Sequence, residues 1–267
     1  MGARQVDTGT AGLVLGVADD GVATLRIDRP EAKGALTAAM WAAIPAILDG
    51  LAHDPEVRVL VLTGTDGVFS AGADIRELRG HYATAESADA YHALNAAAER
   101  ALAAFPKPTI ALVQGPCVGG GCQLAVACDL RFADANARFG VTPAKLGIVY
   151  DAGSAHRLAR VVGVPTAKYL LFSAELIDSQ KALRVGLVED VYMPQEAEEK
   201  VYAFARTIAS RSQLTVRAAK DLLGSDTVDP ERVRAWERRS RESSDVREGL
   251  AAFTERRAPH FTWGVEE

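Results

Sequence analysis

The fold is decided by the stretch VQGPCVGGGCQLAVACDLRFAD, residues Val113–Asp134. It begins inside an apolar run, Thr109–Gln114, which predicts a strand that is covered on both faces. Gly115 and Pro116 predict a turn, and the glycines at 119–121 open a helix that we expect over Cys122–Cys128. A helix start leaves N–H groups unpaired, and glycine lets a ligand come close to them. This junction is therefore suited to bind an oxyanion.

A second junction of the same kind lies upstream. Val57–Thr63 is another apolar run that predicts a buried strand, and FSAGADI at Phe69–Ile75 is a glycine-containing turn that leads into a helix. Two units in this order predict stacked turns of strand, strand and helix. Neither has the glycine pattern of a phosphate-binding loop or of a dinucleotide-binding fold. If the two helix starts face one point, their N–H groups can hold the oxygen of a thioester enolate.

The N-terminal part of the chain predicts a hairpin and a helix. Leu13–Val17 and Val22–Ile27 are short β-compatible runs joined by a turn that contains Asp-Gly, a strong hairpin signal. A helix capped by Thr37 follows. We expect Pro45 to kink it, because the proline ring removes one backbone hydrogen bond.

Helices are predicted for most of the remaining chain. Thr84–Phe105 predicts a long helix, and after about residue 195 nearly every stretch has an amphipathic pattern, with breaks near Gly224 and Asp229. The sequence therefore predicts two regions. Residues 1–195 form a core with the ligand site, and residues 196–267 form a helical C-terminal region.

Composition limits the class of protein. The 267 residues are 48% apolar, enough for a large core, and the net charge of −5 weighs against a nucleic-acid partner. Cys117, Cys122 and Cys128 have neither the spread of a disulfide framework nor the spacing of a metal site, so we expect free thiols and no metal. We find no signal peptide and no membrane span, which predicts a cytoplasmic protein without a membrane partner.

Five segments, in the same order along nearly the whole chain, resemble the enoyl-CoA hydratase/isomerase (crotonase) superfamily. They are RPEAKGAL (29–36), FSAGADIREL (69–78), the run at 113–134, the stretch FG…LGIV (139–149) and DVREGLAAFTERR (245–257). The resemblance implies a mixed α/β fold, a crotonase-like spiral of strand, strand and helix, with a helical C-terminal region that trimerises. It also implies an acyl-CoA substrate, a homotrimer or dimer of trimers, and no tightly bound cofactor, with coenzyme A present as part of the substrate.

The resemblance assigns roles to individual positions. The backbone N–H groups of Ala73 and Gly120 correspond to the two oxyanion donors. Asp74 lies in the coenzyme A segment but is expected to act as a helix cap. The positions that correspond to contacts with coenzyme A and the thioester are Lys33, Ala35, Ala71, Ala73, Asp74, Ile75, Arg76, Gly120, Phe253 and Arg256. The last two belong to the C-terminal helix, which in the family often contacts coenzyme A across a subunit interface.

The sequence departs from the family where hydratases carry two glutamates. Gln123 occupies the first position and Pro143 the second. A glutamine amide can orient a group but cannot exchange protons near neutral pH. Asp151 lies where other branches of the superfamily place their acidic group, so it is our candidate base. Asp151 is also an ordinary N-cap for the helix that follows, and both interpretations stay open.

Several reactions fit these residues. One base and two backbone donors favour double-bond isomerisation over hydration, because no water has to be activated. Decarboxylation, carbon–carbon bond hydrolysis and thioester hydrolysis use the same oxyanion device in relatives. A protein that binds acyl-CoA without turning it over is the alternative from a different class.

Overall fold

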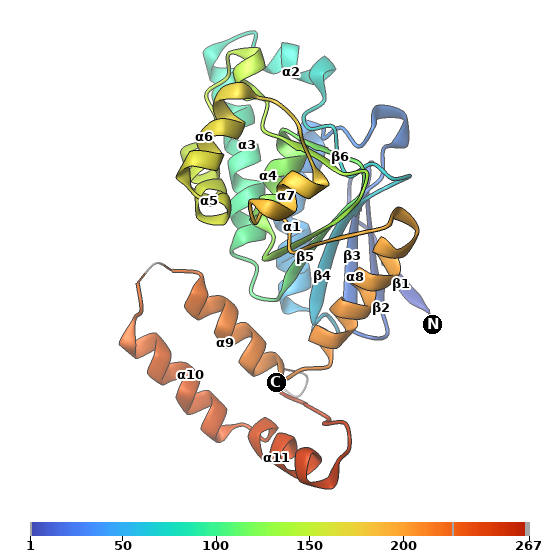
Figure 1. Cartoon of the computed structure of the whole chain (residues 1–267), viewed down its shortest axis with the longest axis vertical. Helices are drawn as coiled ribbons and strands as arrows, with labels where there is room; N and C mark the ends of the chain where they lie inside the picture. Colours follow the sequence, from blue (N-terminus) through green and yellow to red (C-terminus); the bar gives the residue numbers. More distant parts are fainter. Residues whose placement is uncertain (1, 226, 265–267) are drawn as a thin grey trace.

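The computed structural model describes residues 2–225 and 227–264. A central sheet has helices on both faces, and three helices extend from it as an arm at the C-terminal end (Figure 1).

The large sheet has seven strands in the order β1-β2-β3-β4-β5-β7-β10. The first three strands are antiparallel, which confirms the predicted hairpin, and the strands from β3 to β10 are parallel. Both predicted apolar runs are buried strands, β4 and β5, covered on both faces. The strands are β1 (Ala3–Val6), β2 (Leu13–Ala18), β3 (Val22–Ile27), β4 (Val59–Gly64), β5 (Thr109–Val113), β7 (Leu130–Asp134) and β10 (Asp190–Tyr192).

A second, smaller sheet gives the fold its spiral. It contains β6 (Pro116–Val118), β8 (Arg138–Gly140) and β9 (Ile177–Asp178). Single bridges from Leu36 to Ala73 and from Ser70 to Cys117 extend the same row of stacked segments. The chain repeatedly passes from the large sheet to this second layer and then into a helix, which confirms the crotonase-like spiral.

Helices cover the large sheet on both faces. One face packs against α1 (Ala38–His53), α3 (Ala85–Ala103) and α4 (Gly120–Ala127), and the other packs against α8 (Pro194–Ala209). The shorter helices are α2 (Ile75–His81), α5 (Ala152–Val162), α6 (Val164–Ser173) and α7 (Ser179–Arg184).

Threonine side chains cap both long helices, and the cap predicted at Thr37 is confirmed. Thr37 accepts a hydrogen bond from the Met40 N–H at 3.2 Å and caps α1, which continues past Pro45 to His53. Thr84 caps α3 in the same way through the Ser87 N–H.

The C-terminal region divides into two parts. Helix α8 packs on the sheet through Ala197, Val201 and Ala205, so by its contacts it is part of the core. The arm consists of α9 (Gln213–Leu223), α10 (Pro230–Glu242) and α11 (Asp245–Glu255), and it stands away from the sheet (Figure 1). The breaks predicted near Gly224 and Asp229 separate α9 from α10.

Candidate active site

The two glycine-rich junctions meet backbone to backbone. Gly72 has φ +97°, and a Cβ at this position would lie 2.8 Å from the Val118 carbonyl oxygen. Gly119, in the other junction, has φ 53° and ψ −118°, a conformation that is open only to glycine. Both junctions therefore need glycine where they approach each other.

This arrangement leaves two N–H groups free at one place. Leu36 donates to the Gly72 carbonyl at 2.8 Å and accepts from the Asp74 N–H at 2.9 Å, so the N–H of Ala73 points away from Leu36. Gly120 is the first residue of α4, where no intrahelical acceptor exists. Within residues 2–225 and 227–264, neither N–H has a hydrogen-bond acceptor.

Ala73 and Gly120 line the same open pocket, which has an empty volume of about 780 Å³. Its walls come from α1, α2, α3, the start of α4 and the loop before α5. Most of the lining is apolar or aromatic, including Trp41, Leu78, Tyr91, Leu146, Ile148, Val149 and Tyr150. The structure thus brings both predicted donors to an apolar cleft, the setting in which such donors stabilise charge well.

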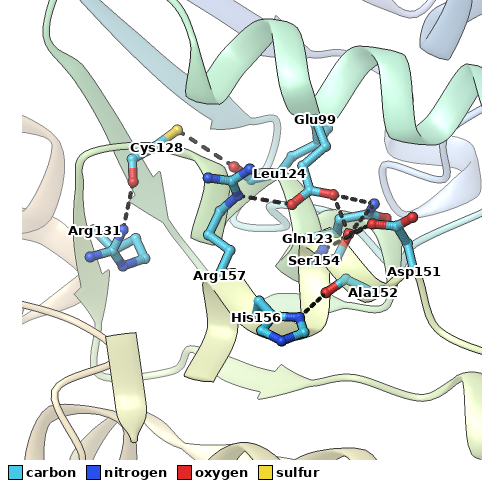
Figure 2. A network of polar contacts seen from close by, with 10 residues as sticks. All are labelled: Glu99, Gln123, Leu124, Cys128, Arg131, Asp151, Ala152, Ser154, His156 and Arg157. Carbon is cyan, nitrogen blue, oxygen red and sulfur yellow. Dashed lines mark hydrogen bonds and ion pairs between the residues drawn. The ribbon is translucent and has the colours of Figure 1, made fainter. Parts of the chain in front are cut away.

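Asp151 faces this pocket and also caps a helix. Its Oδ1 accepts a hydrogen bond from the Ser154 N–H at 2.9 Å, which confirms the N-cap of α5. Asp151 also lines the pocket, and it is the only carboxylate among the lining residues in the described part of the chain. Figure 2 shows its carboxylate beside the start of the helix that it caps. The two interpretations of Asp151 are compatible in this geometry.

Gln123 and Pro143 also line the pocket. The Gln123 Nε2 donates to Glu99 Oε2 at 2.8 Å and to Ser154 Oγ at 3.0 Å (Figure 2). A carboxylate only accepts hydrogen bonds, so the nitrogen end of the amide must face Glu99, and the amide oxygen is the end left for the pocket. Position 123 therefore offers an acceptor but no base.

Glu99 is a site residue that our reasoning from the sequence missed. It lies on α3, is 2% exposed, and pairs with Arg157 Nε at 3.0 Å while the Ser154 hydroxyl donates to it. The signal was present in the sequence, because Glu99 falls eight residues after Tyr91 and three before Leu102, on the buried face of the helix. Glu99 does not line the pocket, and it acts on the pocket through Gln123.

Tyr150 completes the wall next to this network. Burial raises the pKa of the Tyr150 hydroxyl well above its usual value, and the charges of Cys122 and Glu99 raise it further. The phenol is therefore neutral at physiological pH. It can offer a hydrogen bond, but it is not a base.

Two of the segments predicted to bind coenzyme A, 33–35 and 71–76, lie side by side. The Ala71 N–H donates to the Lys33 carbonyl at 2.9 Å, and Arg29 Nη1 donates to the Ala35 carbonyl at 2.7 Å and to Asp74 Oδ2 at 3.0 Å. Ile75, at the start of α2, is 61% exposed and lines the pocket.

Asp74 is a helix cap, as predicted. It accepts from the Arg76 N–H at 3.0 Å at the start of α2. Burial alone would raise the pKa of Asp74, but Arg29 and the backbone N–H groups outweigh it, and the pKa lies below its usual value. Asp74 therefore remains ionised and holds the Arg29 turn against the oxyanion loop.

Phe253 and Arg256 lie elsewhere in the same subunit. They are on α11 and at its C-terminal cap, and Phe253 is 86% exposed. None of the described residues that line the pocket comes from α9, α10 or α11. The contact of these two residues with coenzyme A stays a prediction.

Comparison with known proteins places this geometry in a family. The family model described as enoyl-CoA hydratase/isomerase matches residues 18–264. The chain belongs to the enoyl-CoA hydratase/isomerase family. The match covers both glycine-rich junctions, the pocket residues and all three helices of the C-terminal arm. Enzymes of this family act on acyl-CoA thioesters.

Similar proteins in other organisms are named as hydratases. The chain is 36% identical to a crotonyl-CoA hydratase of Syntrophomonas wolfei over 249 residues, covering 91% of this chain and 95% of that protein. It is 37% identical to a 2,3-dehydroadipyl-CoA hydratase of Escherichia coli, covering 90% of this chain and 94% of the relative. These names support the enoyl-CoA hydratase family and do not specify isomerase or lyase activity.

Solved structures agree with the fold. An enoyl-CoA hydratase/isomerase family protein from Hyphomonas neptunium superposes with a TM-score of 0.91 at 36% identity, covering 96% of this chain and all (100%) of that chain. An enoyl-CoA hydratase from Bacillus anthracis gives a TM-score of 0.86 at 32% identity, covering 94% and 98% of the two chains. In the present chain, no described helix has both the length and the apolar character that a membrane span needs.

Proposed function

We propose that this enzyme moves the double bond of an enoyl-CoA thioester, with Asp151 as the base. One observation carries the proposal: Asp151 is the only carboxylate that lines the pocket within the described residues. The sequence resemblance supports it, because it assigns Gln123 and Pro143 to the positions where hydratases of the family carry two glutamates. The Asp151 carboxylate lies in the same cleft as the two free N–H groups, whereas His92, which also lines the pocket, shares a hydrogen bond of 2.6 Å with the Tyr82 hydroxyl.

The reaction needs no other proton carrier. Asp151 removes a proton from the carbon next to the thioester carbonyl, and the electron pair moves onto the carbonyl oxygen and into the conjugated double bond. The N–H groups of Ala73 and Gly120 hold that oxygen while it is negative. Asp151 then returns the proton at the far end of the conjugated system. Each oxyanion donor of this kind lowers the barrier by about 3–4 kcal/mol.

Hydration is the second candidate, and the names of the relatives favour it. In that reaction the Gln123 amide oxygen would accept a hydrogen bond from a water molecule, and Asp151 would take its proton. The products distinguish the two candidates, because isomerisation leaves the mass unchanged and hydration adds one water. Decarboxylation, carbon–carbon bond hydrolysis and thioester hydrolysis each give a lighter acyl product or free coenzyme A.

We further propose that coenzyme A lies along the turn at Lys33–Ala35 and the segment Ala71–Arg76. Ala71–Ala73 and the exposed side chain of Ile75 line the pocket, and the Ala71 N–H donates to the Lys33 carbonyl at 2.9 Å. Phe253 and Arg256 would reach the same coenzyme A from another subunit of a homotrimer or a dimer of trimers. No tightly bound cofactor is needed for a proton shift of this kind.

Asp151→Asn tests the base. Asparagine is as good an N-cap as aspartate, so the variant should fold with unchanged stability while kcat falls by about 10²–10⁴. We would follow 3-enoyl-CoA and 2-enoyl-CoA esters by mass and ultraviolet absorbance together. Asp178→Asn is the matched control, since Asp178 caps α7 through the Lys181 N–H at 2.7 Å and does not line the pocket.

The outcomes are distinct. An isobaric product that disappears in Asp151→Asn, but not in Asp178→Asn, supports the proposal. Full activity in Asp151→Asn would show that another group is the base. A product heavier by one water would replace isomerisation with hydration, and tight binding without any product would make the protein an acyl-CoA binder.

A further inference from the structure

The Ser154 hydroxyl lies between two carboxylates, those of Glu99 and Asp151 (Figure 2). Its Oγ is hydrogen-bonded to Glu99 Oε2 and lies 3.3 Å from Asp151 Oδ1. Ser154 and Glu99 are each 2% exposed, whereas Asp151 lines the pocket. One serine hydroxyl is therefore within reach of both the proposed base and a buried acid behind it.

The Ser154 hydroxyl has only one proton to share between these carboxylates. A hydroxyl donates once and accepts through two lone pairs, and Gln123 Nε2 already donates to the Ser154 Oγ at 3.0 Å. Glu99 is the closer of the two carboxylates, so the hydroxyl proton goes to Glu99. Asp151 Oδ1 keeps the Ser154 backbone N–H at 2.9 Å as its donor.

Glu99 is held in place as an acceptor by donors on both of its oxygens. Arg157 Nε donates to Glu99 Oε1 at 3.0 Å, while Oε2 accepts from Gln123 Nε2 at 2.8 Å and from the Ser154 hydroxyl. Hydrogen bonds of this charge-assisted kind are about twice as strong as neutral ones. The direction of the Ser154 hydroxyl is therefore set by a fixed group outside the pocket.

This direction matters for the strength of the base. A hydroxyl that donates to a carboxylate stabilises its ionised form, and the carboxylate then takes up a proton less readily. Because Glu99 accepts the hydroxyl proton, the Ser154 side chain does not weaken Asp151 in this way.

We propose that Glu99 is a positioning residue, which keeps the Ser154 hydroxyl turned away from Asp151 and so preserves the strength of the base. Glu99 does not line the pocket, and it acts on Asp151 only through Ser154. The inference rests on the proposed role of Asp151. It applies to any reaction that begins with removal of the proton next to the thioester carbonyl.

Glu99→Gln removes the charge of this residue and keeps the size of its side chain. Arg157 can only donate, so the oxygen of the new amide must face Arg157 and its nitrogen must face Ser154. The Ser154 oxygen then accepts, and its proton turns to Asp151 Oδ1 at 3.3 Å. The Tyr150 hydroxyl is another neighbour of Ser154, but a carboxylate is the stronger acceptor.

Deuterium exchange on a saturated ester measures the base directly. The probe is hexanoyl-CoA in deuterium oxide, and mass spectrometry follows deuterium uptake at the carbon next to the thioester carbonyl. We expect Glu99→Gln to exchange about tenfold more slowly than the starting protein at saturating ester, the effect of one hydrogen bond to a charged group. The dissociation constant for hexanoyl-CoA should change by less than about twofold, because Glu99 does not line the pocket.

A second substitution shows whether the Ser154 hydroxyl causes the loss. Glu99→Gln combined with Ser154→Ala should recover most of the exchange rate, because no hydroxyl is left to donate to Asp151. Any change at Gln123 is common to the single and the double variant, so the difference between them isolates the hydroxyl. A role of Glu99 in packing alone predicts no such recovery.

Two controls accompany these variants. Ser154→Ala in the starting protein should not accelerate exchange, because its hydroxyl already donates to Glu99. Glu189→Gln is the matched loss of an ion pair, since Glu189 Oε1 pairs with Arg131 Nη2 at 2.9 Å and Glu189 does not line the pocket. This variant should exchange at the rate of the starting protein.

A second route keeps the test valid if Glu99→Gln does not fold. Glu99→Met combined with Arg157→Met replaces both ions by apolar side chains, a change that is often neutral for stability. The Ser154 hydroxyl then has Asp151 as its remaining carboxylate, so exchange should again be slow and should again recover with Ser154→Ala.

The outcomes separate this inference from the proposed function. Slow exchange in Glu99→Gln that Ser154→Ala restores supports the positioning role. Unchanged exchange in Glu99→Gln, or a loss that Ser154→Ala does not restore, overturns that role and leaves Asp151 as the base. Exchange that survives in Asp151→Asn, or no exchange in the starting protein, would refute the proposed base itself and the positioning role with it.

Discussion

Lys107 is a buried charge at the end of α1. Its Nζ donates to the carbonyl oxygens of Leu51 at 2.7 Å and Asp54 at 2.6 Å, and the residue is 1% exposed. Burial, aided by the positive charge of Arg217, lowers the pKa of Lys107 from 10.5 to about 8. The lysine thus satisfies carbonyls that α1 leaves unpaired, while its own charged form is disfavoured by desolvation.

This shift predicts stability that rises with pH. Because the pKa is lower in the folded state, the unfolded chain binds more protons between about pH 8 and pH 10.5. The free energy of unfolding should therefore increase in that window by up to about 1.4 kcal/mol per pH unit, and Lys107 should add no slope below pH 8.

Urea unfolding at several pH values from 7 to 10 measures this slope. The free energy of unfolding of Lys107→Met should rise less steeply with pH than that of the starting protein, whatever the absolute stability of the variant. Lys168→Met, at an exposed position, is the control. Its free energy of unfolding should rise with pH as steeply as that of the starting protein. Parallel pH profiles for the starting protein and Lys107→Met would refute the assignment.

Single residues also show what the sequence could not reveal. The positions of Asp151, Gln123 and both oxyanion donors follow from sequence motifs, since each lies in a segment with a fixed local geometry. The hydrogen bond between Gln123 and Glu99 does not follow from any motif. Glu99 lies on α3, 24 residues before Gln123, and only the packing of α3 on α4 brings the two side chains together. The periodicity of a helix predicts which of its faces is buried, but it does not predict which residues of another helix that face contacts.

At the scale of elements, the approach of the two junctions depends on Gly72. An alanine there would need φ +97° and would place its Cβ 2.8 Å from the Val118 carbonyl oxygen. We expect Gly72→Ala to lower the free energy of unfolding by about 1–3 kcal/mol, the range for backbone strain of this type. We also expect kcat to fall, because the shifted turn moves the Ala73 N–H.

Gly50→Ala is the matched control for this substitution. Gly50 lies inside α1, and nothing would contact its added Cβ within 4 Å. Removing a helical glycine should raise stability by about 0.5–1 kcal/mol and leave kcat unchanged. Urea unfolding and steady-state rates on both variants check the pair. A Gly72→Ala protein with normal stability and rate would show that the junctions do not depend on close approach.

Element boundaries show where local sequence signals end. The sequence predicts the start of α4 at Cys122, because glycine is a poor helix former, yet α4 begins at Gly120. Tertiary contacts explain the difference. A Cβ at Gly120 would collide with Trp41, and one at Gly121 would lie 2.6 Å from the Ser70 Cβ. Packing therefore requires glycine in this first turn, and the predicted order of elements is confirmed although the boundary moves by two residues.

At the scale of the whole molecule, the arm carries several large apolar side chains that are exposed in the single chain. Its large exposed apolar side chains are Leu223, Val228, Val246, Leu250 and Phe253, with exposed fractions from 47% to 86%. The arm is tied to the core near its base, where Lys220 Nζ contacts Asp129 Oδ2 at 2.7 Å and the Lys107 carbonyl at 2.8 Å. An apolar surface on an anchored arm is typical of a subunit interface.

We therefore predict that the protein is a trimer or a dimer of trimers, held in part by this arm. Leu250→Asp combined with Phe253→Asp should release monomers, because two charges cannot be buried in an apolar interface without partners. Size-exclusion chromatography with light scattering gives the mass directly. Met193→Asp is the control. Met193 is 54% exposed and precedes α8, where an aspartate is favourable, so its mass should stay that of the starting protein.

The same variant tests whether subunits share the ligand site. If Phe253 and Arg256 contact coenzyme A across the interface, released monomers should bind coenzyme A esters more weakly, although the residues that line the pocket in one subunit are unchanged. Arg256→Ala in an intact oligomer should show the same loss, since one charged contact to a phosphate contributes about 1.5–3 kcal/mol. Monomers that retain full affinity would contradict the shared site. A starting protein that is monomeric would refute the interface itself, and the apolar surface of the arm would then need another partner.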